Sequence, residues 1–218
     1  MIIENKFDYK ELSRIEDNNE RRYLTPQGSK VPSVTTIIGK TKDLTFLREW
    51  QKSVGKEKAE KIKVEASTLG TGMHKNIENY ILDKPMSGSF MAQTLAKLII
   101  DKGLANVNSI WGSEVSLYSL DLYAGTTDLV GLHQDQPAII DFKNSLREKK
   151  LEWIDDYRAQ IGAYALAHNE MFGTNIRKGV VMIATRDAIY QEFVFEGGEF
   201  DKCVTLWLNI LEKYYKLQ

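Results

Sequence analysis

Two aspartates lie in apolar segments of the second half of the chain. Asp128 precedes Leu129-Val130, and Asp141 follows Ile139-Ile140. A carboxylate in a buried segment is costly unless a hydrogen bond or a cation satisfies it. Two carboxylates brought close together raise a pKa or bind a cation. Mg²⁺ or Mn²⁺ is the natural candidate, because these hard ions prefer oxygen ligands.

A lysine follows the second aspartate at the spacing of a strand. Lys143 lies two residues after Asp141, so both side chains point to the same side of an extended chain. An amine there can orient a metal-bound water and stabilise charge on a phosphate, which suits metal-assisted hydrolysis of a phosphodiester. The triplet alone favours a strand-end aspartate that caps a loop, beside a surface lysine. The buried strand and the nearby Asp128 favour the site.

A predicted helix downstream adds polar groups. Gln160 and Tyr164 are four residues apart and therefore share one helix face. A glutamine facing the strands is unusual in a core helix and suits a site that holds water and phosphate. Tyr164, taken alone, is also compatible with ordinary core packing.

The elements that must position these residues follow from hydrophobic periodicity. In the first half we expect a hairpin turning at 25–29, an extended segment over 31–38, helices within 43–83 with a glycine turn at 70–72, and a helix over 90–102. In the second half we expect strands over 111–119, 122–132 and 138–142, a helix over 151–172, a hairpin over 179–195 and a closing helix over 200–217. This order predicts an α/β fold with a helical N-terminal elaboration.

The composition is that of an ordinary globular protein. The chain has 218 residues, of which 43% are hydrophobic and 27% charged, and its formal net charge is −1. That balance excludes a strongly basic DNA coat, so any nucleic acid must meet a local patch. The single cysteine excludes an internal disulfide and a four-cysteine iron–sulfur cluster. No apolar run approaches the roughly 18 residues of a membrane span, and the N-terminus has no signal-peptide pattern.

A lysine-rich stretch is the candidate patch. Residues 52–63 include Lys52 and Lys56, and Arg48 and Trp50 precede them. Such a run is usually a solvated helix face, and the alternative is a surface that contacts backbone phosphates. Trp50 could stack on a base or pack into the helix core.

Several of these segments together resemble a known family. Gly125-Thr-Thr-Asp128, Asp141-Phe-Lys143-Asn-Ser145 and Gln160-x-x-x-Tyr164 resemble the PD-(D/E)XK nuclease superfamily, RecB-like branch. The upstream segments Val31–Ile38 and Gly70–Glu78 resemble the mitochondrial genome maintenance exonuclease type and its phage relatives. The resemblance spans residues 30–165. The chain departs from it at Asn144-Ser145, where the family more often has Thr-Ser.

The resemblance implies a restriction-endonuclease-like fold, a central mixed sheet flanked by helices. It implies one nuclease domain over 1–218, with a hairpin and helical arch or wall over 1–108 and a catalytic core over 109–218. The metal ligands would be His74, Asp128, Asp141 and the Phe142 carbonyl. Glu114, on the preceding strand, could be a further ligand or a surface acid. Lys143 would position the attacking water, with Gln160 and Tyr164 supporting the site.

The function implied by the resemblance is a Mg²⁺- or Mn²⁺-dependent DNA exonuclease without an iron–sulfur cluster. It would prefer single strands or open ends and act in the cytoplasm of a bacterium or phage-infected cell, in DNA repair or recombination. The DNA contacts would come from Arg48, Trp50, Lys52, Lys56 and Ser145. An endonuclease, an RNA-acting nuclease and a catalytically silent nucleic-acid-binding module on the same fold are the alternatives.

Overall fold

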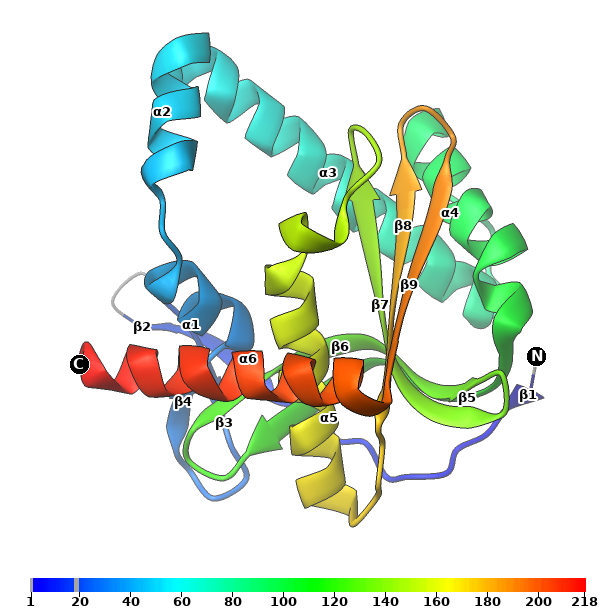
Figure 1. The fold of residues 1–218 in the computed structure, drawn as a ribbon. Helices are drawn as coiled ribbons and strands as arrows, with labels where there is room; N and C mark the ends of the chain where they lie inside the picture. The colour runs from blue at the N-terminus through cyan, green and yellow to red at the C-terminus, as the bar shows by residue number, and fades with distance from the viewer. Residues whose placement is uncertain (1, 18–19) are drawn as a thin grey trace.

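A six-stranded mixed sheet forms the centre of the molecule, with helices on both faces (Figure 1). The computed structural model describes residues 2–17 and 20–218. The strand order is β1-β5-β6-β7-β8-β9. The strands are β1 (Ile2–Ile3), β5 (Val107–Ser119), β6 (Tyr123–His133), β7 (Gln136–Ser145), β8 (Lys178–Thr185) and β9 (Tyr190–Glu196). This architecture confirms the predicted α/β class with a central mixed sheet flanked by helices.

The strand directions divide the sheet into two halves. β5, β6 and β7 form an antiparallel meander. β8 then runs parallel to β7, and β9 returns antiparallel to β8. The long helix between β7 and β8 makes the parallel step possible, because parallel neighbours need a crossover connection.

Two helical layers cover the sheet. On one face, α3 (Lys56–Ile81) and α4 (Phe90–Lys102) bury a cluster that includes Met73, Ile77 and Leu95. On the other face, α5 (Asp155–Phe172) and α6 (Gly197–Lys216) pack with α1 (Val34–Thr41) around Trp207. Two short 3-10 turns, η1 (Leu104–Asn106) and η2 (Leu151–Trp153), precede β5 and α5. None of the helices in the described residues is long and apolar enough to cross a membrane.

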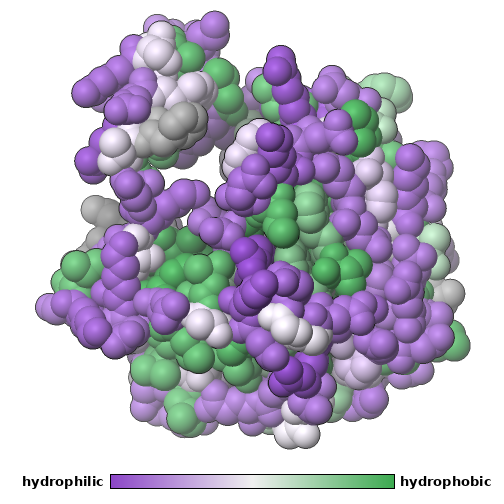
Figure 2. Space-filling view, in the orientation of Figure 1, coloured by the Kyte–Doolittle hydropathy of each residue, from purple (hydrophilic) through white to green (hydrophobic). Residues whose placement is uncertain are grey.

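Part of the molecule stands away from this core. α2 (Thr45–Val54) and the first half of α3 form a projecting helical arm (Figures 1 and 2). Gly55 separates the two helices with φ 87°, a left-handed conformation that glycine adopts without strain. The small antiparallel sheet of β2 (Ser13–Asp17), β3 (Glu20–Leu24) and β4 (Lys30–Pro32) lies beside the core and contains the predicted hairpin turn.

The prediction of an extended segment over 31–38 is wrong beyond Pro32. Ser33 caps α1, because its Oγ accepts a hydrogen bond from the Thr36 amide at 3.0 Å. Val34, Ile37, Ile38 and Thr41 are all buried. Their spacing is that of one helix face, so the packing of this face outweighs the β preference of the branched residues.

The predicted glycine turn at 70–72 is also wrong, because both glycines lie inside α3. A Cβ on Gly72 would lie 2.8 Å from the Ala92 Cβ of α4, and one on Gly70 would lie 3.1 Å from Asn144. These glycines therefore let α3 lie close to α4 and to the end of β7. Close packing, not a change of direction, explains the pattern.

The N-terminal segment is joined to α5 through a buried histidine. His168 is fully buried, and its two ring nitrogens lie 2.8 Å from the Tyr9 and Thr174 hydroxyls. Phe7 and Phe172 pack against its ring. Burial lowers the pKa of His168 to about 4.

We expect His168 to make the protein less stable in acid. Its folded pKa is below the ordinary value of about 6.5, so the unfolded chain binds the extra proton between these values. Stability is therefore present near neutral pH and falls as the pH drops towards 4, by about 3 kcal/mol from this residue. Urea unfolding of wild type and His168→Gln across this range measures the difference. A constant difference between the two proteins would contradict the prediction.

Candidate active site

The β6–β7 ladder brings the two aspartates together. Leu129 pairs with Ile140 in this antiparallel register, so Asp128 and Asp141 are the next opposite positions. The Phe142 amide donates a hydrogen bond to Asp128 Oδ2 at 2.6 Å. Asp141 is 2% exposed. Two carboxylates on neighbouring strands therefore share one largely buried site.

Lys143 lies on the same side of β7 as Asp141. Its Nζ is 2.6 Å from Asp141 Oδ2 and donates a hydrogen bond to Gln160 Oε1 at 3.2 Å. The Tyr157 ring centroid lies 5.2 Å from the same nitrogen. The structure thus brings together Asp141, Lys143 and Gln160, as the sequence predicted, and positions the amine from two elements, β7 and α5.

A second group of ligands meets Asp128 from the opposite side. His74 Nδ1 of α3 lies 3.2 Å from Asp128 Oδ1 and 3.9 Å from Glu114 Oε1. Ligand atoms of His74, Glu114 and Asp128 all lie within 4.8 Å of one another, so this group could hold a metal ion. Glu114, which the sequence left open between a ligand and a surface acid, lies in this group.

The backbone at Glu114 is unusual for a strand. Its φ is 51°, in the left-handed region that costs a non-glycine residue about 1–3 kcal/mol. Such strained residues are concentrated at functional sites, because the surrounding structure must impose them. Glu114 lies within β5, between the residues that pair with Leu129 and Thr127, so it is beside Asp128.

Burial and ion pairing act in opposite directions on the pKa values of Asp128 and His74. Burial raises the pKa of Asp128, but His74, Lys143 and the Phe142 amide outweigh it, and the net pKa is lowered. Burial lowers the pKa of His74, but Asp128 outweighs it and the net pKa is raised. Asp128 is therefore held as a carboxylate that pairs with the imidazole.

The two other carboxyl groups are shifted the other way. Burial, together with the Asp128 charge, raises the pKa of Asp141 to about 6 and that of Glu114 to about 7. Burial lowers the pKa of Lys143, but Asp141 and Asp128 outweigh it and the net pKa is raised. Lys143 thus remains a cation, and the cluster carries carboxylate charge that a divalent ion would stabilise.

The residues present match the chemistry of a divalent cation. Asp141 Oδ2 is buried and pairs with the Lys143 ammonium group at 2.6 Å, and a carboxylate oxygen has a second lone pair. This oxygen therefore keeps a lone pair for a ligand. Carboxylate oxygens with one imidazole suit Mn²⁺ and Mg²⁺. Asp128, Asp141, Glu114 and His74 would hold the ion, and the Phe142 carbonyl stays a predicted ligand.

Tyr164 packs against the strand that carries Asp128. It is 3% exposed, and a Cβ on Gly125 would lie 2.9 Å from its hydroxyl and Cε1. Gly125 therefore makes room for the ring. Burial and the nearby aspartates raise the pKa of Tyr164 well above its usual value, so its hydroxyl stays neutral.

Two hollows meet at the acidic group. A cavity of about 490 Å³ extends from Glu114 and Glu78 towards Tyr9, Arg14 and Tyr23. A second, of about 360 Å³, is lined by Gly70, His74, Glu78 and Glu114. The ligand group is therefore accessible from solvent.

The predicted DNA contacts lie outside this cluster. Arg48, Trp50 and Lys52 are on α2 of the helical arm, and Lys56 begins α3. The three cations are exposed and Trp50 is half-buried. Ser145 ends β7, and its Oγ donates to the Arg147 carbonyl at 2.6 Å. Their role in DNA binding stays a prediction.

Two residues of the site carried no predicted role. Tyr157 lies against Lys143, and Asn144 donates a hydrogen bond to the Ala66 carbonyl of α3 at 3.1 Å. Tyr157 precedes Gln160 by three residues and Tyr164 by seven, so it shares their helix face. That spacing is a sequence pattern from which a role for Tyr157 could have been predicted. No sequence pattern indicates the hydrogen bond of Asn144, because its partner lies 78 residues away in the chain.

Comparisons with known proteins do not decide the function. No family model and no curated protein matches the chain. Among solved structures, SSO0001 aligns with a TM-score of 0.46 at 19% identity, covering 86% of this chain and 76% of that one. A "putative exonuclease" from Eubacterium rectale aligns with a TM-score of 0.47 at 13% identity, covering 69% and 68%. Both likenesses are too low to support an argument about activity.

We expect Mn²⁺ to stabilise the protein through Glu114. At a hundredfold excess over Kd, binding adds about 2.7 kcal/mol, or about 5–10 °C in Tm, and a tenfold weaker site would roughly halve this gain. Glu114→Gln should therefore show at most half the wild-type rise. Without metal it should melt no lower than wild type, because it removes a like charge beside Asp128.

Differential scanning fluorimetry with Mn²⁺, and then with excess chelator, measures both effects. Glu212→Gln is the matched control, because Glu212 pairs with Lys216 on the exposed side of α6. An equal Mn²⁺ shift in Glu114→Gln and wild type would exclude Glu114 as a ligand.

Proposed function

We propose that this chain is a divalent-metal-dependent DNA nuclease, most simply an exonuclease that acts on single strands or open ends. The observation that carries the proposal is the buried pair of Asp141 and Lys143 on β7, next to the His74, Glu114 and Asp128 group. Acidic ligands supply the cation site, and a fixed ammonium group lies beside it. The division into a helical wall over 1–108 and a core over 109–218 is part of this proposal.

The residues divide the chemistry between them. A bound divalent ion would supply Lewis acidity and a water of lowered pKa for attack on phosphorus. Lys143 stays protonated, so it donates hydrogen bonds to the attacking water or a phosphate oxygen and does not act as a base. Gln160 and Tyr157 keep its amine in place. Tyr164, neutral and packed on Gly125, excludes water behind the aspartates.

The proposal predicts cleavage that depends on Asp141 and Lys143. We expect hydrolysis of end-labelled single-stranded DNA in Mg²⁺ or Mn²⁺, and a loss of at least about a hundredfold in Asp141→Asn and in Lys143→Gln. Asp101→Asn and Lys97→Gln are matched controls, since this pair lies on the exposed side of α4, 2.9 Å apart. Full activity in both site variants would overturn the mechanism.

The same assay separates the alternatives. A circular single strand stays intact with an exonuclease and is cut by an endonuclease. A labelled RNA of the same sequence tests substrate class. Binding without cleavage in either metal would favour the silent binding module.

A further inference from the structure

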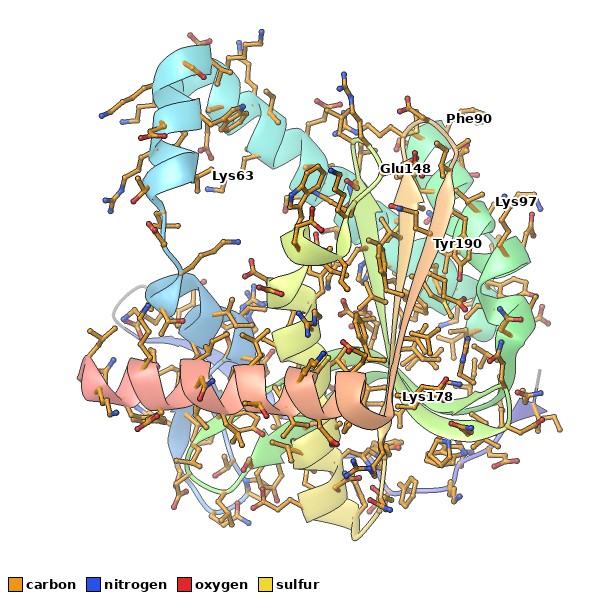
Figure 3. The ribbon with its side chains drawn as sticks, in the orientation of Figure 1. Lys63, Phe90, Lys97, Glu148, Lys178 and Tyr190 are labelled. Carbon is orange, nitrogen blue, oxygen red and sulfur yellow. The ribbon has the colours of Figure 1, made fainter. Side chains whose placement is uncertain are left out.

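The loop between β7 and α5, residues 146–154, exposes apolar and cationic side chains together. Trp153 is 58% exposed and Leu146 is 60% exposed. Arg147, Lys149 and Lys150 belong to the same loop. Figure 3 labels Glu148 on it, beyond the end of β7. An exposed tryptophan among cations is a typical surface for unstacked nucleic acid bases.

The loop holds Trp153 in a defined place. The Lys149 amide donates to Gln191 Oε1 at 2.7 Å, and Gln191 Nε2 donates to the Lys149 carbonyl at 3.0 Å. The Trp153 amide donates to the Lys150 carbonyl at 3.0 Å, and the next residue, Ile154, is fully buried. A ligand would therefore meet an ordered loop and lose little conformational entropy in binding it.

The cations of the loop have no acidic partners. Within residues 2–17 and 20–218, Arg147, Lys149 and Lys150 form no ion pair, whereas Lys61 and Lys63 of the helical arm pair with glutamates of α3 at 2.8 and 3.6 Å. Lys150 Nζ lies 5.2 Å from the Trp153 ring centroid. Unpaired cations attract phosphate more strongly than paired ones, so the loop is a better candidate for backbone contacts than this part of the arm.

Both ends of the loop adjoin the candidate active site. It begins three residues after Lys143, and its far end leads to Tyr157, which lies against Lys143 Nζ. Tyr157 is four residues after Trp153, a span of at most about 14 Å. Phe90 is also highly exposed, but it begins α4 at the outer side of the molecule (Figure 3). Trp153 is therefore an exposed indole within a short span of the residues that hold Lys143.

We infer that residues 146–154 bind single-stranded DNA beside the cutting site, with Trp153 stacked on a base and Arg147, Lys149 and Lys150 on phosphates. The identity of this ligand rests on the proposed nuclease function. A duplex keeps its base faces stacked on one another, so the exposed ring favours a single strand.

The test measures binding in EDTA, where no hydrolysis occurs. An oligothymidine strand should quench the fluorescence of wild type, and Trp153→Ala should bind it about 5- to 100-fold more weakly. Trp153→Phe should stay within about threefold of wild type, because phenylalanine also stacks. Trp207→Phe is the matched control and should keep both affinity and quenching, because Trp207 of α6 is fully buried.

Two further measurements test the inference without relying on the Trp153→Ala variant alone. An abasic strand should bind wild type as weakly as oligothymidine binds Trp153→Ala. Replacing Arg147, Lys149 and Lys150 together with glutamine should reduce the salt slope of log K by about 2. Wild-type affinity in Trp153→Ala, or quenching lost in Trp207→Phe instead, would overturn the inference.

The outcomes also separate this inference from the proposed function. Weakened binding by Trp153→Ala, in a protein that cleaves no nucleic acid in Mg²⁺ or Mn²⁺, would retain the loop as a binding site and reject the nuclease. Cleavage of DNA, together with equal DNA affinity in Trp153→Ala and wild type, would reject the loop as a binding site and retain the nuclease. An altered oligomeric state in Trp153→Ala with unchanged DNA binding would assign the surface to a second copy of the chain.

Discussion

The structure depends on hydrogen-bonding and cationic partners for the two carboxylates that are buried at the β6–β7 ladder. Asp128 and Asp141 lie directly beyond the last paired residues of this ladder, and burial there costs each carboxylate part of its hydration. Asp128 regains contacts from His74 and the Phe142 amide, and Asp141 regains them from Lys143. These partners come from α3 and β7, and Gln160 of α5 accepts a hydrogen bond from Lys143. The packing of both helical layers therefore sets the geometry of one small site.

The protein's own groups do not balance all of the negative charge at this site, and Glu114 is the residue that shows it. Glu114 adds a third carboxylate to the group, from a left-handed position in β5. Burial and the Asp128 charge raise its pKa. A fold selected for stability alone would replace such a residue, because it costs both backbone and electrostatic energy. Binding of a cation to the Glu114 carboxylate would offset both energies. The energetic cost of Glu114 is therefore linked to the proposed function.

The sequence predicted most elements and the position of Lys143 on the same side of a strand as Asp141, because both depend on local patterns. The α4 bounds and the Gly173 end of α5 follow from periodicity and capping, and the Asp141–Lys143 pair follows from strand alternation. The sequence did not predict helix α1. The buried contacts of the helix face that includes Val34 outweigh the preference of β-branched residues for strands. The positive φ of Glu114 and the Asn144–Ala66 bond had no sequence signal, since both arise from contacts between distant segments.

The helical arm and the loop after β7 illustrate why charge count is a poor guide to a binding surface. α3 is 26 residues long, but only its second half has a continuous buried face against α4 and the sheet. Its first half is supported by pairs of glutamate and lysine at helical spacing, which neutralise part of its positive charge. The loop at 146–154 has fewer lysines but leaves them unpaired beside an exposed indole. Lys61 and Lys63 therefore attract phosphate less than the three loop cations do, although all five are basic.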